Sequence, residues 1–275
     1  IVGDSDLIVK TNGNLYNYLT MRGEGDVSIS ANSINNNNAT LKANGGMTLA
    51  TTANVSNIRG SITAATGDLS IVSTKGTLDN TWGMLTSGAN ALVKVASVFY
   101  NNYATTWSAG NLDITASTLY NSSNGSMEND TATGVIASDK NLTLNVDNSF
   151  TNYGWISSKD SLNLNVQKGV LYNRNTLSAD NALAINALNG VENFQDIVAG
   201  TRVSIDTQKH VTNNTRSNIL AQNIVINAVK DINNRGNIVG DYSLTAKTSG
   251  NIYNYLNMLS YGVAGVTANN VTNSG

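Results

Sequence analysis

The sequence contains neither Cys nor Pro among its 275 residues. The lack of Cys excludes disulfide bonds, thiolate metal sites and cysteine nucleophiles. Charged residues make up only 12% of the chain, the formal net charge is -2, and the Lys and Arg residues are scattered. We therefore expect neither a nucleic-acid groove nor a surface for anionic membranes. Apolar runs are only a few residues long, so no segment is expected to span a membrane.

Aromatic residues are also sparse, at 6%, whereas Asn is abundant, with 45 residues or about one in six. This proportion is several times that of an average soluble protein. Low charge and much Asn are compatible with disorder, but 40% of the residues are hydrophobic, which is enough to build a core. A chain of this length could form one elongated domain or two globular ones.

An internal repeat runs through the whole chain, marked by an apolar residue, any residue and then Asn. Eleven of the twelve spacings between successive Asn residues of this motif lie between 19 and 23 residues, and the exception is 31. The thirteen motif residues are Asn17, Asn36, Asn57, Asn80, Asn101, Asn121, Asn152, Asn173, Asn193, Asn213, Asn234, Asn254 and Asn273.

Two further patterns keep the same period and indicate strands. About eight residues before each Asn an alternating apolar segment begins, as at 142–146, and four to six residues after most of them an apolar residue is followed two later by a small one, as at 177–179. This period of two predicts three short strands per repeat. Because each strand has only one apolar face, the repeats must stack. We predict an all-β, right-handed parallel β-helix of about 13 turns, forming a single domain over 1–275.

The repeated Asn should point inward, like the apolar residue two positions earlier. Identical Asn side chains on successive turns can hydrogen-bond as a ladder, so a structural role is favoured over a catalytic one. A second corner is rich in Gly and Asp, as at Gly25-Asp26, and a stack of Asp could bind calcium. The Gly-Gly-x-Gly-x-Asp nonapeptides of calcium β-rolls do not occur, so Asx turns are the preferred interpretation. We expect no metal and no cofactor.

The segment from Gly110 to Ala116 reads Gly-Asn-Leu-x-Ile-x-Ala and is followed by apolar-x-Asn and then Ile-x-Ser. This pattern resembles the haemagglutinin repeats of filamentous haemagglutinin, and the resemblance covers residues 4 to 275. Such repeats occur in the large two-partner secretion exoproteins of Gram-negative bacteria, which include adhesins, haemolysins and contact-dependent growth inhibition effectors. The resemblance implies a right-handed β-helix, export through an outer-membrane transporter, and secretion to the cell surface.

The same family has Asn-Pro signatures in its amino-terminal secretion domain, and this chain has no Pro. It also starts without Met and without a charged-then-apolar leader. We therefore expect an interior fragment of a longer rod.

The long spacing marks an insertion loop at about 122–134, which is polar and mildly acidic. Long loops on a rigid scaffold often carry recognition, which makes Ser123, Asn124, Glu128 and Asp130 candidate partner-binding residues. The alternative is a tolerated insertion without a role, because lengthening a loop costs little.

Tyrosines supply the second candidate surface. Tyr100, Tyr120 and Tyr172 are middle residues of the motif, which should face solvent, and Tyr103 lies near the same edge. A column of exposed Tyr can stack on sugar rings or anchor a protein receptor. The alternative is that Tyr simply suits a solvent-facing strand. Trp107 is instead assigned to an inward position.

Enzymes with a β-helix fold need clustered acids, or a base with calcium-binding Asp, in a groove walled by long loops. Here nearly all predicted turns are short, the 15 Asp and 3 Glu are spread out, and His210 is the only histidine. No nucleophile motif accompanies that histidine, which is predicted to point outward. We predict no catalytic residues; the alternative function is a carbohydrate-active β-helix enzyme, a polysaccharide lyase or hydrolase.

The function predicted first is an extended shaft segment of a secreted cell-surface exoprotein. It would present an adhesive or toxin-delivery region to a target cell and could itself bind a protein or glycan receptor. A growth-inhibition effector is favoured over a host-directed adhesin, although no residue distinguishes them.

Overall fold

The computed structural model describes residues 1–122 and 134–274, which divide into two compact units, 1–142 and 143–275. Every regular element in the described residues is a β-strand, and the strands pair in parallel with their counterparts one repeat away. Each repeat contributes one turn of a β-solenoid, and thirteen strands carry or directly precede the repeated Asn. The all-β, parallel β-helix of about 13 turns that the repeat predicts is confirmed.

Each turn contains three strands, here called the first strand, the Asn strand and the third strand. The first strands of unit 1 are β2 (Leu7–Lys10), β5 (Val27–Ala31), β8 (Met47–Thr51), β11 (Leu69–Ser73), β14 (Ala91–Val95) and β17 (Leu112–Ala116). Its Asn strands are β3 (Asn14–Tyr16), β6 (Ser33–Asn35), β9 (Val55–Ser56), β12 (Leu78–Asp79), β15 (Val98–Tyr100) and β18 (Thr118–Asn121). Its third strands are β1 (Val2–Gly3), β4 (Thr20–Gly23), β7 (Thr40–Ala43), β10 (Ser61–Ala64), β13 (Met84–Ser87), β16 (Thr105–Ser108) and β19 (Val135–Ser138).

Unit 2 repeats this plan, and β20 (Leu142–Val146) lies at the boundary. Its first strands are β23 (Leu162–Val166), β26 (Ala182–Ala187), β29 (Arg202–Thr207) and β36 (Val263–Thr267). Its Asn strands are β21 (Phe150–Asn152), β24 (Leu171–Asn173), β27 (Val191–Asn193), β30 (Val211–Asn213), β32 (Ile232–Asn234), β34 (Asn251–Asn254) and β37 (Asn270–Asn273). Its third strands are β22 (Trp155–Ser158), β25 (Leu177–Ala179), β28 (Asp196–Ala199) and β35 (Asn257–Ser260). In β31 (Asn218–Ala228) and β33 (Asn237–Thr248) one long strand provides both the third strand and the following first strand.

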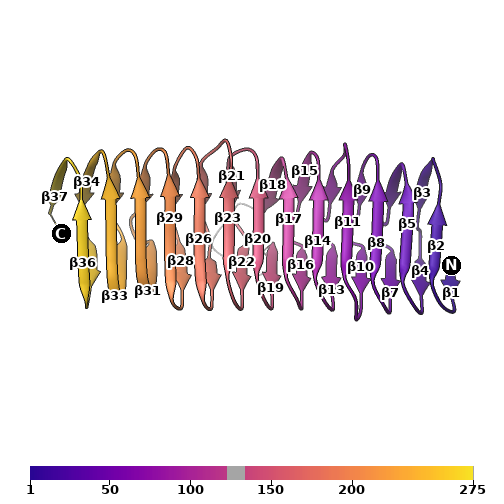
Figure 1. The fold of residues 1–275 in the computed structure, drawn as a ribbon. Helices are drawn as coiled ribbons and strands as arrows, with labels where there is room; N and C mark the ends of the chain where they lie inside the picture. The colour runs from indigo at the N-terminus through magenta and orange to yellow at the C-terminus, as the bar shows by residue number, and fades with distance from the viewer. Residues whose placement is uncertain (123–133, 275) are drawn as a thin grey trace. The chain divides into compact units, whose positions relative to one another are not determined.

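Register keeps equivalent residues of successive repeats beside each other. In unit 1, Ile29 pairs with Leu49, and Leu49 with Ile71. In unit 2, Leu183 pairs with Val203. Within each unit the first strands lie side by side in chain order, as Figure 1 shows for β5, β8 and β11. The side chain at a given repeat position therefore forms a column along the unit.

The core lies inside the turns, because alternate residues of every strand point inward. The first strands β5, β8 and β14 alternate strictly between buried and exposed residues. The two largest fully buried side chains are Phe99 and Phe150, both on Asn strands. Burial of this continuous aliphatic column is the main stabilising contribution.

The inward assignment of Trp107 is wrong. In β16 the buried residues are Thr106 and Ser108, and Trp107 lies on the outer face, where its Nε1 donates to Asp139 Oδ1 at 3.3 Å. Thr106 can be buried because its hydroxyl donates to the Oδ1 of Asn101 at 2.9 Å. Because the hydroxyl of Thr106 has a hydrogen-bond partner in the core, Thr106 points inward and Trp107 points outward, which is the opposite of what their apolar character predicts.

The repeated Asn side chains are joined by amide–amide hydrogen bonds. In unit 1, Asn36 Nδ2 donates to Asn57 Oδ1 at 2.7 Å, and bonds of 2.7–3.2 Å connect Asn17 through Asn121 in the same direction. In unit 2, bonds of 2.7–3.1 Å connect Asn152 through Asn273. All but the last are buried. Most of these Asn side chains also donate to backbone carbonyls, as Asn36 Nδ2 donates to Ala39 O and Ser61 O, so the ladder closes the corner of the turn.

Candidate functional site

The corner that follows β12 is a tight turn. Gly83 N donates to Asn80 O at 2.8 Å, and Trp82, the third residue of the turn, has φ of 58°. A positive φ at this position is the mark of a type II turn, which favours Gly or Asn there. The Gly that follows is required for space, because a Cβ at Gly83 would lie 2.3 Å from Asn57 O. The geometry of the corner is therefore fixed by the stacked backbone.

Four successive turns place a residue of positive φ at this corner: Asn38, Arg59, Trp82 and Tyr103. Asn tolerates this conformation, whereas a bulky side chain in it costs roughly 1–2 kcal/mol. The backbone hydrogen bond from Trp82 N to Asn102 O, 2.9 Å, and that from Tyr103 N to Ser122 O, 3.0 Å, hold the corners in register. Residues held in such conformations occur most often at functional sites, so these corners are candidate positions for one.

Two pairs of aromatic rings stack on neighbouring turns of unit 1, and one of these pairs lies at the strained corners. Trp82 and Tyr103 stack with ring centroids 4.2 Å apart and planes within 6°. Tyr100 and Tyr120, which are paired residues of β15 and β18, stack at 5.2 Å and 6°. Trp82 is 48% exposed and Tyr120 is 46% exposed. These four residues, called the aromatic edge below, offer exposed ring surface on a rigid scaffold, which suits contact with another molecule.

Sequence reasoning did not find Trp82, although a signal was present. It follows Asn80 by two residues, just as Tyr103 follows Asn101, so the repeat places both residues at the same corner on adjacent turns. The other candidate residues do not join this cluster. Tyr172, in unit 2, lies between Thr151 and Glu192 in its column, without a neighbouring ring there. The remaining candidates, Ser123, Asn124, Glu128 and Asp130, lie outside the described residues.

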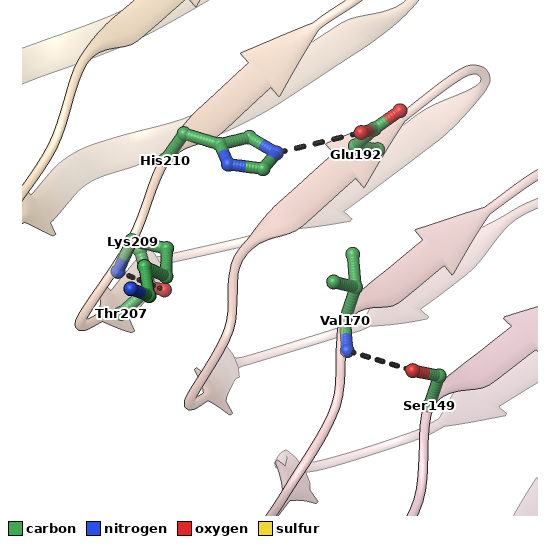
Figure 2. Close-up of polar contacts among 6 residues, drawn as sticks. All are labelled: Ser149, Val170, Glu192, Thr207, Lys209 and His210. Carbon is green, nitrogen blue, oxygen red and sulfur yellow. Dashed lines mark hydrogen bonds and ion pairs between the residues drawn. The ribbon is translucent and has the colours of Figure 1, made fainter.

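The single histidine is paired with a carboxylate rather than with a nucleophile. His210 Nε2 lies 3.4 Å from Glu192 Oε1 on the neighbouring turn (Figure 2). Figure 2 also shows two hydroxyl groups that bind backbone instead: Ser149 Oγ accepts from Val170 N, and Thr207 Oγ1 accepts from Lys209 N, both at 3.1 Å. The described contacts of His210 therefore do not form a nucleophile–base pair.

Aspartate side chains at the second corner accept hydrogen bonds from the backbone of the next turn. Asp26 N donates to Asp6 Oδ1 at 2.8 Å, and Gly46 N donates to Asp26 Oδ1 at 2.7 Å. Across the residues that the structure describes, no group of three His, Asp or Glu side chains is placed to hold a metal ion. These carboxylates act as backbone acceptors from one turn to the next.

In a comparison with protein families, the haemagglutinin repeat model matches residues 22–81 and 107–174. Neither the curated proteins nor the solved structures include a match to this chain. The two matched stretches and the β-solenoid fit a filamentous haemagglutinin-like repeat region.

The haemagglutinin repeat match and the β-solenoid support an adhesin-like exoprotein segment. None of the described residues forms a helix long and apolar enough to cross a membrane.

Proposed function

We propose that the chain is a shaft segment of a secreted cell-surface exoprotein and that its aromatic edge contacts a receptor on a target cell. The producing cell is a Gram-negative bacterium, and export runs through an outer-membrane transporter of the two-partner secretion type. This proposal extends the haemagglutinin repeat match at residues 22–81 and 107–174. The observation that carries the receptor contact is the strained, exposed stack of Trp82 on Tyr103.

The proposed mechanism is mechanical and adhesive. Stacked turns give a scaffold whose stability is distributed over repeats, as expected for a solenoid. Trp and Tyr are the side chains that most often dominate binding energy at protein interfaces, and burying one costs little conformational entropy because it has only two χ angles. Because the rings are already stacked on each other in the free protein, they lose little further conformational entropy on binding, and the aromatic edge is preorganised.

Adhesion of the purified chain, coupled to beads, to bacterial and to host cells tests this function. Tyr100→Ser combined with Tyr120→Ser should reduce the bound fraction severalfold. The matched control is Tyr16→Ser with Tyr18→Ser, since this pair is also exposed and stacked, at 6.2 Å, but lies away from the edge.

Binding to bacteria but not to host cells would support a growth-inhibition effector, and the reverse would support a host-directed adhesin. Equal adhesion by both double variants and by the unaltered chain would show that the proposed surface is wrong.

A further inference from the structure

A continuous groove runs along unit 2 beside the ends of its first strands. One stretch, of about 540 Å³, extends from Asn145 to Gln208. A second, of about 390 Å³, extends from Asp206 to Ser249 and shares three residues with the first. The buried last residues of successive first strands, among them Ala187 and Ala228, line the bottom of the groove.

One wall of the groove is a column of amides and one carboxylate. These are residues of equivalent position on successive turns: Asn145, Asn165, Asn186, Asp206 and Asn227, and the column ends at Lys247 on the next turn. The equivalent positions of unit 1 are Ser30, Ala50, Val72, Lys94 and Thr115. The fold therefore accepts many residue types here, and the run of planar hydrogen-bonding groups is specific to unit 2.

The opposite wall alternates between amides and aliphatic side chains. Gln167, Leu188, Gln208 and Val229 follow the first wall's residues by two positions on successive turns. Leu188 is 46% exposed and Val229 is 40% exposed. A ligand in the groove would thus meet apolar surface on one side and hydrogen-bonding groups on both.

The amide column is interrupted at its centre. Asn186 donates to Asn165 at 3.0 Å, and Asn165 donates to Asn145 at 2.9 Å. Asn227 donates to Asp206 at 2.8 Å, but an ionised Asp206 has no proton to pass to Asn186. The Oδ1 of Asn186 and the carboxylate of Asp206 are therefore neighbouring acceptors that no hydrogen bond joins in the described structure. Two ligand hydroxyl groups, one donating to each of these oxygens, would satisfy both acceptors.

The course of the groove selects the shape of the ligand. Its lining residues occupy equivalent positions on successive turns, so the groove suits an extended ligand rather than a curved one. Equatorial linkage keeps a chain of pyranoses extended. Each ring carries hydroxyl groups on its edge, which suit the amides, and C–H groups on its faces, which suit Leu188 and Val229.

The charge of the groove agrees with this choice. Among its lining residues the charged groups are Asp206 and Lys247, which are of opposite sign. A polyanion such as a nucleic acid needs several cations to neutralise its phosphates, and this groove lacks them. We infer that the groove binds an extended, uncharged, equatorially linked glycan, with Asn186 and Asp206 at the centre of the site. This inference does not depend on the aromatic edge, which lies in unit 1.

Calorimetric titration of the whole chain with cellohexaose tests the groove. Maltohexaose, which has the same composition but an axial linkage and a curved chain, is the matched ligand. Cellohexaose should bind saturably, and maltohexaose should bind at least about tenfold more weakly. The inference is overturned if cellohexaose does not bind at millimolar concentration, or if both sugars bind equally.

Two substitutions locate the site. Asn186→Ala removes an acceptor, and Asp206→Asn supplies the missing donor and closes the column without changing its shape. Each should weaken cellohexaose binding by about tenfold, corresponding to one lost hydrogen bond. Ser204→Ala is the control, because Ser204 faces outward on the same strand but does not line the groove.

Unchanged circular dichroism and melting temperature for Asp206→Asn would show that its fold is intact. Affinity unaltered by both groove variants would place the glycan elsewhere and refute the site. Adhesion to cells through the aromatic edge would be untouched by that result, so the two proposals fail separately.

Discussion

Asn193 ties three turns of unit 2 together through one buried side-chain amide. Its Nδ2 donates to Asn213 Oδ1 at 2.9 Å, to Gln195 O at 2.6 Å and to Asn218 O at 3.1 Å, while its Oδ1 accepts from Asn173 at 2.9 Å. Asn193→Ala deletes all four contacts and leaves their partners inside the solenoid, where water cannot replace the amide.

The structure limits how large the loss should be. After the substitution Asn213 Oδ1 still accepts from Ser217 Oγ at 2.7 Å, and Asn173 Nδ2 still donates to Asp196 O at 3.1 Å. The lost hydrogen bonds and incompletely satisfied partners together predict that Asn193→Ala lowers the free energy of unfolding by about 1–3 kcal/mol.

Urea denaturation followed by circular dichroism measures this free energy, with equal denaturant slopes required for the comparison. Asn163→Ala is the control, because Asn163 is an exposed residue of β23, and its substitution should change stability by no more than about 0.5 kcal/mol. Equal stability of the two variants would refute a stabilising role for the buried ladder.

Three other substitutions, measured by the same denaturation, test the corners and the surface. Gly83→Ala should lower the free energy of unfolding by about 1–3 kcal/mol, because the new Cβ would clash with a backbone oxygen. Gly13→Ala should lower it by less than about 1 kcal/mol, because the nearest atom to the new Cβ is 3.6 Å away. A loss of less than about 1 kcal/mol for both variants would contradict the tight geometry of the Gly83 corner. Trp82→Asn should change stability by less than about 1 kcal/mol, because relief of the positive φ offsets the lost stacking, so a larger loss would make Trp82 structural. His210→Ala should also change stability by less than about 1 kcal/mol, because the contact between His210 and Glu192 is partly exposed, and a greater loss would argue against such a weak contact.

The solenoid was predictable because two local signals coincide at a fixed period. Alternation identifies the strands, as in β5, and the repeat interval between Asn residues requires each strand to meet its counterpart one turn away. The continuous strands β31 and β33 were less predictable. There the third strand passes into the first with only a register shift between Ala221 and Asn223, so no turn residues mark the corner.

The aromatic edge was only partly predictable. Pairing of Tyr100 with Tyr120 depends on strand register, and the repeat supplies that register directly. The stack of Trp82 on Tyr103 depends instead on positive φ at two corners, a conformation that neither residue type favours. The groove of unit 2 was not predicted, because Asn is so abundant in the sequence that composition alone does not distinguish the Asn residues of the groove from the others.

Cell adhesion of two corner variants tests the receptor contact most directly. Trp82→Asn and Arg59→Asn change adjacent corners of the same column, and both remove a bulky residue from a position of positive φ. Only the first breaks the aromatic stack. The account predicts that Trp82→Asn loses most of the adhesion to target cells while Arg59→Asn retains it, and equal adhesion by the two variants would contradict it.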